Sequence, residues 1–310
     1  MVLILRAVFV LAFVFAGFFR PLQAQAASDS LGVEFWLAFP GNAFCCGTPT
    51  LSLFITGPTA TTGTVSGPGI GSTINFTVTP GTVTTVPIPV SAHLTTFDGV
   101  QAKGFRVTAG AEVTVYGLNR IVASTDAYLG LPVDILGTEY IVLGYKNSNI
   151  VNATEFAVVA PQDGTVVTIT PAVTTGPHPA GAPYNVTLNQ GDAYQLVNTN
   201  AAPADLSGTI VTATKPVAVF GGHNCANIPP GQVACDHIVE QLTPPDSWGK
   251  SFATMPLATR LNGDTFRFLA STNNTQVSLT AFSWLPSTGV SSTSASSPAP
   301  HTSHLRSRSS

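Results

Sequence analysis

Four side chains with metal-binding and redox chemistry stand in near-symmetric order in the string GGHNCANIPPGQVACDH, residues 221–237. One residue separates His223 from Cys225, one separates Cys235 from His237, and nine lie between the two cysteines. Because side chains alternate along a strand, each histidine would share a face with its neighbouring cysteine, so a tetrahedral Cys₂His₂ zinc site is geometrically feasible. The same residues also suit a redox pair or a disulfide-closed loop, and the cellular compartment decides among these alternatives.

The N-terminus indicates the compartment. Arg6 precedes a continuous apolar run over residues 7–19, and Ala24 and Ala26 supply the small residues of a cleavage site. This pattern predicts a signal peptide over 1–26. The apolar run is short for a membrane anchor, which needs about 20 residues. We therefore expect a secreted or cell-surface protein with no stable membrane span after cleavage.

In an exported chain, cysteines favour disulfides over metal or thiol chemistry. We expect a disulfide between Cys225 and Cys235 that closes a loop around a turn at Pro230-Gly231, and we expect no metal and no cofactor. Closing so short a loop would stabilise the fold by about 2–3 kcal/mol. Cys45 and Cys46 are adjacent, and the sequence does not decide whether they pair with each other or with a distant strand.

The composition excludes one class of partner. Only 9% of the residues are charged, and the formal net charge is −3. No basic stripe is present that could neutralise phosphates, so we expect no nucleic acid partner. The abundance of threonine suits an extracellular β-structure, because threonine is favoured in strands.

Strand signals dominate the chain after residue 26, and no stretch shows the periodicity of an amphipathic helix. β-Branched runs bounded by Gly, Pro and Asn occupy residues 112–118, 140–145, 165–171 and 209–222. The sequence therefore predicts an all-β protein.

The strands recur in the same order at intervals of about 110 residues, the size of a small β-sandwich domain. The strings EFWLAFP (34–40), EFAVVAP (155–161) and TFRFLAS (265–271) are interpreted as equivalent strands. We expect tandem β-sandwich-like modules over about 32–145 and 146–255 and a truncated third unit over 256–280. The Ser/Thr/Pro-rich tail, 281–310, is expected to be disordered.

An aspartate opens the connector that ends each full module, Asp126 in the first and Asp236 in the second. A pair of carboxylates could serve acid–base catalysis. Since each aspartate belongs to a different repeat, we favour a shared backbone role: both are expected to be structural caps that accept N–H groups at the start of a short helical turn. No catalytic residue is expected.

Four asparagines begin N-x-S/T sequons: Asn75, Asn152, Asn185 and Asn273. Such sequons are acceptors for N-glycosylation where the host modifies its exported proteins.

Four separated motifs occur in an order that resembles a known family: EFWLAFPGN (34–42), STDAYLGLPVDILGTEY (124–140), KPVAVFGGHNCANIP (215–229) and CDHIVEQLTPPDSWGKSF (235–252). Together they resemble the N-terminal domain of the IgGFc-binding protein family. The resemblance runs from about Gly32 to Thr280 and implies an extracellular β-rich binding domain. The partner it implies is the Fc part of immunoglobulin G, but the residues that contact Fc are not a motif that can be matched here.

We therefore expect an extracellular or cell-surface binding or adhesion domain, non-catalytic, with a protein or glycan ligand. The alternative is a structural spacer or envelope repeat without a specific ligand, and a third alternative is an exported metal-dependent hydrolase that uses the His/Cys cluster. The candidate ligand contacts are connector residues with aromatic or amide side chains, each of which could equally pack between modules: Tyr128, Tyr145, Asn147 and Trp248.

Overall fold

The computed structural model describes residues 29–43, 47–147, 153–229, 234–254, 264–278 and 301–303. The predicted signal peptide, Cys45, Cys46, Asn152, the Pro230-Gly231 turn and most of the tail lie outside the described residues. Almost all regular secondary structure of the described part is strand, which confirms the all-β prediction. The described residues also form two short 3-10 helices, η1 (Val90–Ala92) and η2 (Pro245–Ser247). None of its helices is long and apolar enough to cross a membrane.

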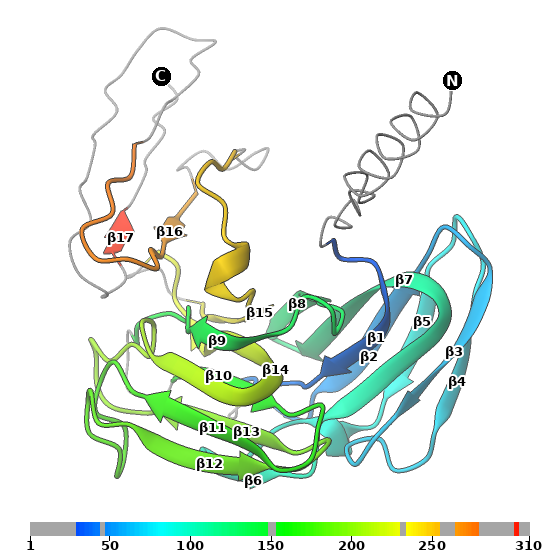
Figure 1. The fold of residues 1–310 in the computed structure, drawn as a ribbon, viewed down its shortest axis with the longest axis horizontal. Helices are drawn as coiled ribbons and strands as arrows, with labels where there is room; N and C mark the ends of the chain where they lie inside the picture. The colour runs from blue at the N-terminus through cyan, green and yellow to red at the C-terminus, as the bar shows by residue number, and fades with distance from the viewer. Residues whose placement is uncertain are drawn as a thin grey trace, which may run out of the picture.

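Two groups of strands follow one another along the chain (Figure 1). The first group, here module 1, comprises β1 (Gly32–Leu37), β2 (Thr50–Thr56), β3 (Thr61–Ser66), β4 (Ile74–Val78), β5 (Thr84–Ile88), β7 (Phe105–Ile121) and β8 (Ser124–Gly130). The second group, module 2, comprises β9 (Gly137–Ile141), β10 (Thr154–Val159), β11 (Thr165–Thr170), β12 (Tyr184–Leu188), β13 (Ala193–Asn198), β14 (Ile210–Ala226) and β15 (Asp236–Gln241).

The two modules share one topology. In module 1 the strand order is β4-β3-β7-β2-β5, with β1 and β8 also paired to β7. In module 2 it is β12-β11-β14-β10-β13, with β9 and β15 also paired to β14. The seven strands therefore correspond one to one in chain order. The additional strand β6 (Asp98–Gln101) leaves module 1 and pairs with β13 at the edge of module 2.

Each module is a sandwich-like unit, as predicted, because one long strand serves two layers. Residues 105–113 of β7 pair with β1 and β3, whereas residues 114–121 pair with β2 and β8. β14 divides its partners in the same way, between β9 and β11 on one side and β10 and β15 on the other. β7 and β14 are each a continuous strand of 17 residues.

The topology corrects the predicted alignment of the repeats. EFWLAFP forms β1, and its structural counterpart is β9, which begins GTEY, rather than EFAVVAP in β10. The error arose because a glutamate-aromatic pair followed by apolar residues occurs in both β1 and β10. Since β9 pairs with β14, the two modules meet between Gly130 and Gly137 rather than near residue 145.

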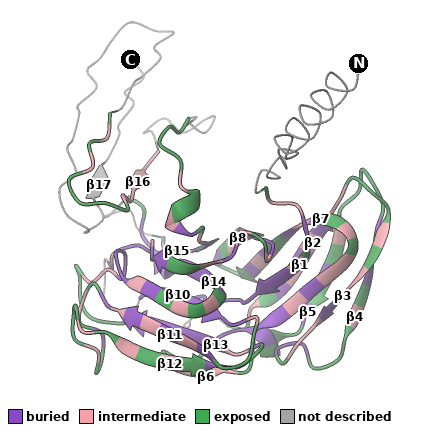
Figure 2. Cartoon of the chain, viewed as in Figure 1, coloured by how far each residue is buried: buried purple, intermediate pink, exposed green. Residues whose placement is uncertain are grey.

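Every residue of β10 and β13, the central strands of module 2, is buried, so both faces of these strands are covered. Figure 2 colours the chain by burial. On one face, Phe156, Val158 and Leu196 belong to the core of module 2. On the other face, Ala157 and Phe220 join the core of module 1. β2, the counterpart of β10, alternates instead between buried and partly exposed residues, because nothing covers its outer face. Module 1 therefore closes over a sheet of module 2.

Aromatic rings fill the contact between the modules. Tyr128 of β8 meets Phe220 of β14 edge-on with ring centroids 5.2 Å apart, and its ring also packs on Phe39 at 5.8 Å. The Tyr128 hydroxyl donates to the Ala38 carbonyl at 2.8 Å. Gly117 leaves room for this ring, since a Cβ atom there would lie 2.4 Å from Tyr128 Cζ.

Side-chain hydrogen bonds join β8 to β15 along the same contact. Asp126 of β8 accepts the N–H of Val239 at 2.8 Å, and Asp236 of β15 accepts the N–H of Thr125 at 3.1 Å. Gln241 likewise accepts the N–H of Leu131 at 2.9 Å. The two aspartates do accept backbone N–H groups, but the predicted helical turns were wrong. Both residues stand in strands, and each carboxylate reaches across to a strand of the other module.

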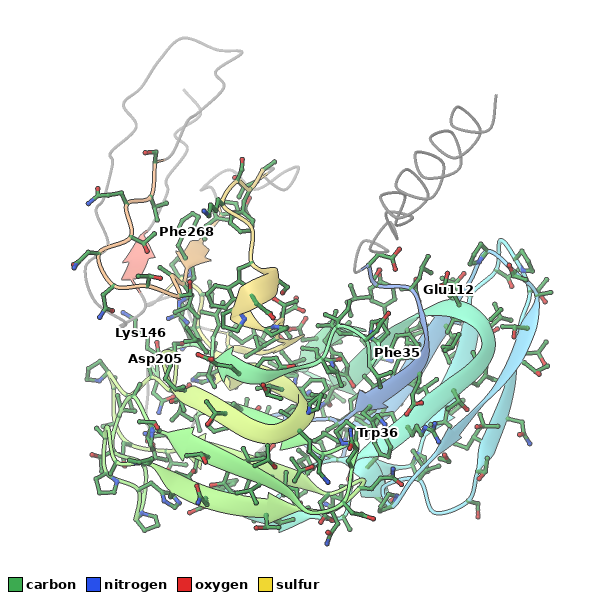
Figure 3. All side chains as sticks on the ribbon, viewed as in Figure 1. Phe35, Trp36, Glu112, Lys146, Asp205 and Phe268 are labelled. Atoms are coloured by element: carbon green, nitrogen blue, oxygen red, sulfur yellow. A yellow bond between two sulfur atoms is a disulfide. The ribbon has the colours of Figure 1, made fainter. Side chains whose placement is uncertain are left out.

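The partial third unit also contacts module 2. The Arg267 guanidinium of β16 (Phe266–Phe268) lies 3.0 Å from the Asp205 carboxylate and 4.9 Å above the centre of the Tyr145 ring. Figure 3 labels Asp205 and, in β16, Phe268. β16 pairs with β17 (His301–Ser303), which belongs to the tail predicted to be disordered. The disorder of the tail stays a prediction.

We expect Asp126→Ala to lower the free energy of unfolding by about 1–3 kcal/mol, because it leaves the N–H of Val239 without its acceptor in the contact between the modules. Urea unfolding measures the change. Asp134→Ala, at an exposed carboxylate, is the control and should change stability by less than about 0.5 kcal/mol. Equal effects of the two substitutions would contradict the role of Asp126.

Candidate binding surface around the Cys225–Cys235 disulfide

The predicted disulfide is present: Cys225 and Cys235 are bonded, with their Cα atoms 5.0 Å apart. It closes the loop between β14 and β15 at its base. The disulfide packs with Ala43 and Ile121 of module 1 in a small apolar cluster of its own. Segments from both modules thus meet around this bond.

Two connections hold these segments in place. The N–H of Ala43, in the segment after β1, donates to the Asn224 carbonyl at 2.9 Å. Asp236, next to Cys235, holds the N–H of Thr125 at the start of β8. The hairpin between β7 and β8 is therefore tied to the disulfide loop of the other module.

The loop is an insertion relative to module 1. β7 and β8 are joined by a tight turn, since Ile121 pairs directly with Ser124. In module 2, β14 ends at Ala226 and β15 begins at Asp236. The register of this strand pair shifts between His223 and Ala226. The disulfide joins the two ends of this inserted segment.

The surface of this region carries two apolar side chains that sequence reasoning missed. Val122, at the tip of the β7–β8 turn, is 99% exposed, and Ile228 in the disulfide loop is 37% exposed. The signal for Val122 was available, since a valine stands in a two-residue turn between polar segments. Val122, Ile228 and the Cys225–Cys235 disulfide define what we call the loop surface.

A buried polar network stands behind the loop surface in module 1. The Asn42 side chain donates to the Asn119 carbonyl oxygen, to Asn119 Oδ1 and to the Ser124 carbonyl, at 3.1–3.3 Å. The N–H of Asn42 donates to His93 Nε2 at 3.2 Å. All four side chains are buried, so these bonds fix the segment after β1 against the start of β8.

Module 2 contains an equivalent network in which a histidine replaces one of the asparagines. Asn147 stands ten residues after the glycine that begins β9, as Asn42 does after the glycine of β1. Its amide donates to the carbonyls of Asn198 and Asn200, both at 2.8 Å. Its Oδ1 atom lies 3.0 Å from Nε2 of His223, which holds the strand position of Asn119. The asparagine after the first strand therefore serves the same backbone geometry in both modules. The side chain that it contacts differs, being Asn119 in module 1 and His223 in module 2.

His223 and His237 of the 221–237 motif form hydrogen bonds in this interior. His223 accepts the N–H of Cys225 at Nδ1, so its proton is on Nε2 and points to Asn147. His237 donates from Nδ1 to the His223 carbonyl at 3.2 Å. The two sulfur atoms are bonded to each other and supply no thiolates, so the Cys₂His₂ zinc alternative does not fit. In the described part of the chain no group of three His, Cys, Asp or Glu side chains is placed to hold a metal ion.

Burial sets the protonation of the interior. It lowers the pKa of His93 to about 4 and of His223 to about 4. Burial also lowers the pKa of His237 to about 3. The carboxyl group of Glu155 in β10 is fully buried without a hydrogen-bond partner, and burial raises its pKa well above the usual value. The three histidines are therefore neutral in the folded protein near neutral pH, and burial favours the protonated form of Glu155.

The predicted ligand contacts are mostly interior residues. Tyr128, Tyr145 and Asn147 are at most 2% exposed, so they do not offer a surface to a ligand. Their burial agrees with the alternative that these connector residues pack in the interior, since they line the cores and the buried networks. Trp248 is half-buried and donates from its ring to the Thr243 carbonyl at 3.0 Å.

Comparisons with known proteins agree on one family. A family model described as IgGFc binding protein matches residues 126–298. A curated human protein, IgGFc-binding protein, is 38% identical over 156 residues, which cover 49% of this chain and 3% of that protein. The chain thus spans a very small part of the length of this relative. No solved structure matches the chain.

Replacing both Cys225 and Cys235 by alanine should lower the free energy of unfolding by about 2–3 kcal/mol, because the loop is then unrestrained in the unfolded chain. Chemical denaturation with and without a reducing agent provides the measurement. Reduction should destabilise the wild-type protein by a similar amount and should add little in the double variant. A double variant as stable as the wild type would contradict this role of the disulfide.

The buried histidines predict a loss of stability in acid. In the unfolded chain histidines take up protons below a pH of about 6.5, whereas the folded state keeps His93 and His223 neutral down to a pH of about 4. Stability is therefore complete above pH 6.5 and is lost as the pH falls towards 4. Glu155 acts in the opposite direction, since its raised pKa favours the folded state at low pH.

The variant His223→Asn isolates one histidine, because asparagine already fills this position in module 1 as Asn119. We expect its free energy of unfolding to fall less steeply between pH 6.5 and 4 than that of the wild type. Urea unfolding at a series of pH values tests this, and the contribution of Glu155 cancels in the comparison. Parallel curves for the two proteins would contradict the prediction.

Proposed function

The chain belongs to the IgGFc-binding protein family, and on that premise we propose that it is a non-catalytic extracellular binding domain that contacts a protein ligand with the loop surface. Export is supported by the N-terminal sequence pattern and by the disulfide, which forms and persists in oxidising compartments. The observation that carries the proposal is the convergence of loops from both modules on one disulfide.

The loop surface has the properties of a small binding site. Its anchors are rigid, because the disulfide, the Asp236–Thr125 hydrogen bond and the Ala43–Asn224 hydrogen bond hold all three segments. Anchoring residues that are already held in place lose little conformational entropy when a ligand binds, which favours affinity. Val122 and Ile228 are exposed apolar groups beside a buried polar network, an arrangement that suits the apolar centre of an interface.

The side chains of the motif support a structural rather than a catalytic role. His223 and His237 hold backbone groups in the interior, and Asp126 and Asp236 hold strands of the opposite module. Their hydrogen bonds account for these groups without any reaction. The spacer alternative predicts the same interior and differs only at the surface, so binding must be measured.

The relative's name makes the Fc part of immunoglobulin G the first probe. Purified protein should be passed over immobilised Fc, mucin and a glycan array at micromolar concentration. We expect retention on a protein ligand, and we expect Val122→Glu and Ile228→Glu each to weaken it at least about tenfold, because a charge would be buried at the interface.

Val83→Glu is the matched control, since Val83 is 60% exposed but lies at the opposite end of module 1. Its neighbour Thr84 pairs with Ile55, whereas the opposite end of β2, Thr50, pairs with Arg120 beside the β7–β8 turn. Binding that survives both loop-surface variants would place the site elsewhere. Retention on no probe would favour the spacer, and retention on glycans alone would contradict a protein ligand.

A further inference from the structure

Two of the N-x-T sequons occupy the same position in the two modules. Asn75 is the second residue of β4, and Asn185 is the second residue of β12, the counterpart of β4. Each is followed two residues later by a threonine on the same face, Thr77 or Thr187. Each also pairs with a threonine of the neighbouring strand. The surrounding sequences, INFTV and YNVTL, differ at the apolar positions, yet both sequons are complete.

Both asparagines point away from the cores. Asn75 and Asn185 are exposed, as are Thr77 and Thr187, whereas Phe76 and the strand ends Val78 and Leu188 are buried. Asn185 Oδ1 accepts a hydrogen bond from the Thr168 hydroxyl at 2.8 Å, which directs its Nδ2 atom outwards. A saccharide attached at Nδ2 would therefore enter solvent without displacing core side chains.

The surface next to Asn75 suits a saccharide. A shallow groove on the outer face of β3, β4 and β7 is lined by Asn75 and by threonines 62, 64, 77 and 108. Threonine hydroxyls can donate and accept hydrogen bonds, as sugar hydroxyls do. The first sugar residue would lie along this row.

The positions of Asn75 and Asn185 in edge strands indicate what glycans attached there would do. β4 and β12 stand at the ends of their strand orders, and within the described residues no further strand pairs with either, although the Thr84 hydroxyl of β5 donates to the Thr77 carbonyl of β4. Open edges with β-branched residues invite pairing with another chain. With 9% charged residues, the protein has few of the charges that commonly block such edges. Bulky, hydrated groups on both edges would prevent this pairing.

We propose that Asn75 and Asn185 are N-glycosylation sites whose glycans cover the open edges of β4 and β12. The donor is a polyprenyl-diphosphate-linked oligosaccharide. Nδ2 of the asparagine forms a bond to the anomeric carbon C1, the bond from C1 to the phosphate oxygen breaks, and the polyprenyl diphosphate leaves with that electron pair. The amide loses one proton to a base, and no oxidant or reductant is needed. The modification rests on the export assumed in the proposed function.

Occupancy is tested on the full chain secreted from eukaryotic cells. Peptide mass spectrometry after amidase removal of glycans in ¹⁸O-water should show Asn75 and Asn185 converted to labelled aspartate. Thr77→Ala and Thr187→Ala should each abolish one glycan, while Thr77→Ser, which retains the sequon, should keep it. Unmodified asparagine at either position in secreted protein would overturn the proposal. Failed export appears separately, as absence of protein from the medium.

Edge protection is tested by trimming the glycans from the folded protein with an endoglycosidase. Sedimentation should then show self-association that increases with concentration and is absent before trimming. A trimmed protein that stays monomeric would overturn the shielding role. Val122→Glu and Ile228→Glu should keep both glycans, so a failure of ligand binding and a failure of glycosylation are distinguishable.

Discussion

The burial of one sheet of module 2 on both faces is the constraint on which the rest of the structure depends. β10 and β13 have no exposed residue, because the core of module 2 covers one face and module 1 covers the other. Removing module 1 would expose Ala157, Val159 and Phe220 to water, at a cost that grows with the apolar area uncovered. The modules are therefore halves of one folded body, although they repeat each other strand by strand.

The polar interior follows from this arrangement. The segments after β1 and β9 lie in the interior, where backbone groups need hydrogen-bond partners. Asn42 and Asn147, in equivalent positions, provide these partners with their side chains. The same burial holds the histidines neutral and orients His223 and His237 towards backbone groups. The motif that could have bound zinc thus stabilises the base of a loop, and the disulfide presents that loop at the junction of the two modules.

Much of the fold could be predicted from the sequence, because alternation and repetition act locally. TLSLFIT alternates and forms a strand with one buried face, and the Cys225–Cys235 bond followed from spacing and compartment. The packing of one module on the other could not be predicted in the same way. Tyr128 could be placed inside only once module 2 was seen to cover it, and Asn147 only once its partners Asn198 and His223 were seen to surround it.

Hydrogen exchange measured by mass spectrometry tests the central claim, that the two modules form one cooperative body, most directly. In the wild type, amides of β2 in module 1 and β10 in module 2 should exchange with the same opening free energy, since both open only when the shared contact is lost. Ala157→Glu, on the face covered by module 1, should accelerate exchange in both strands together. Faster exchange in β10 alone, with β2 fully protected, would contradict the account.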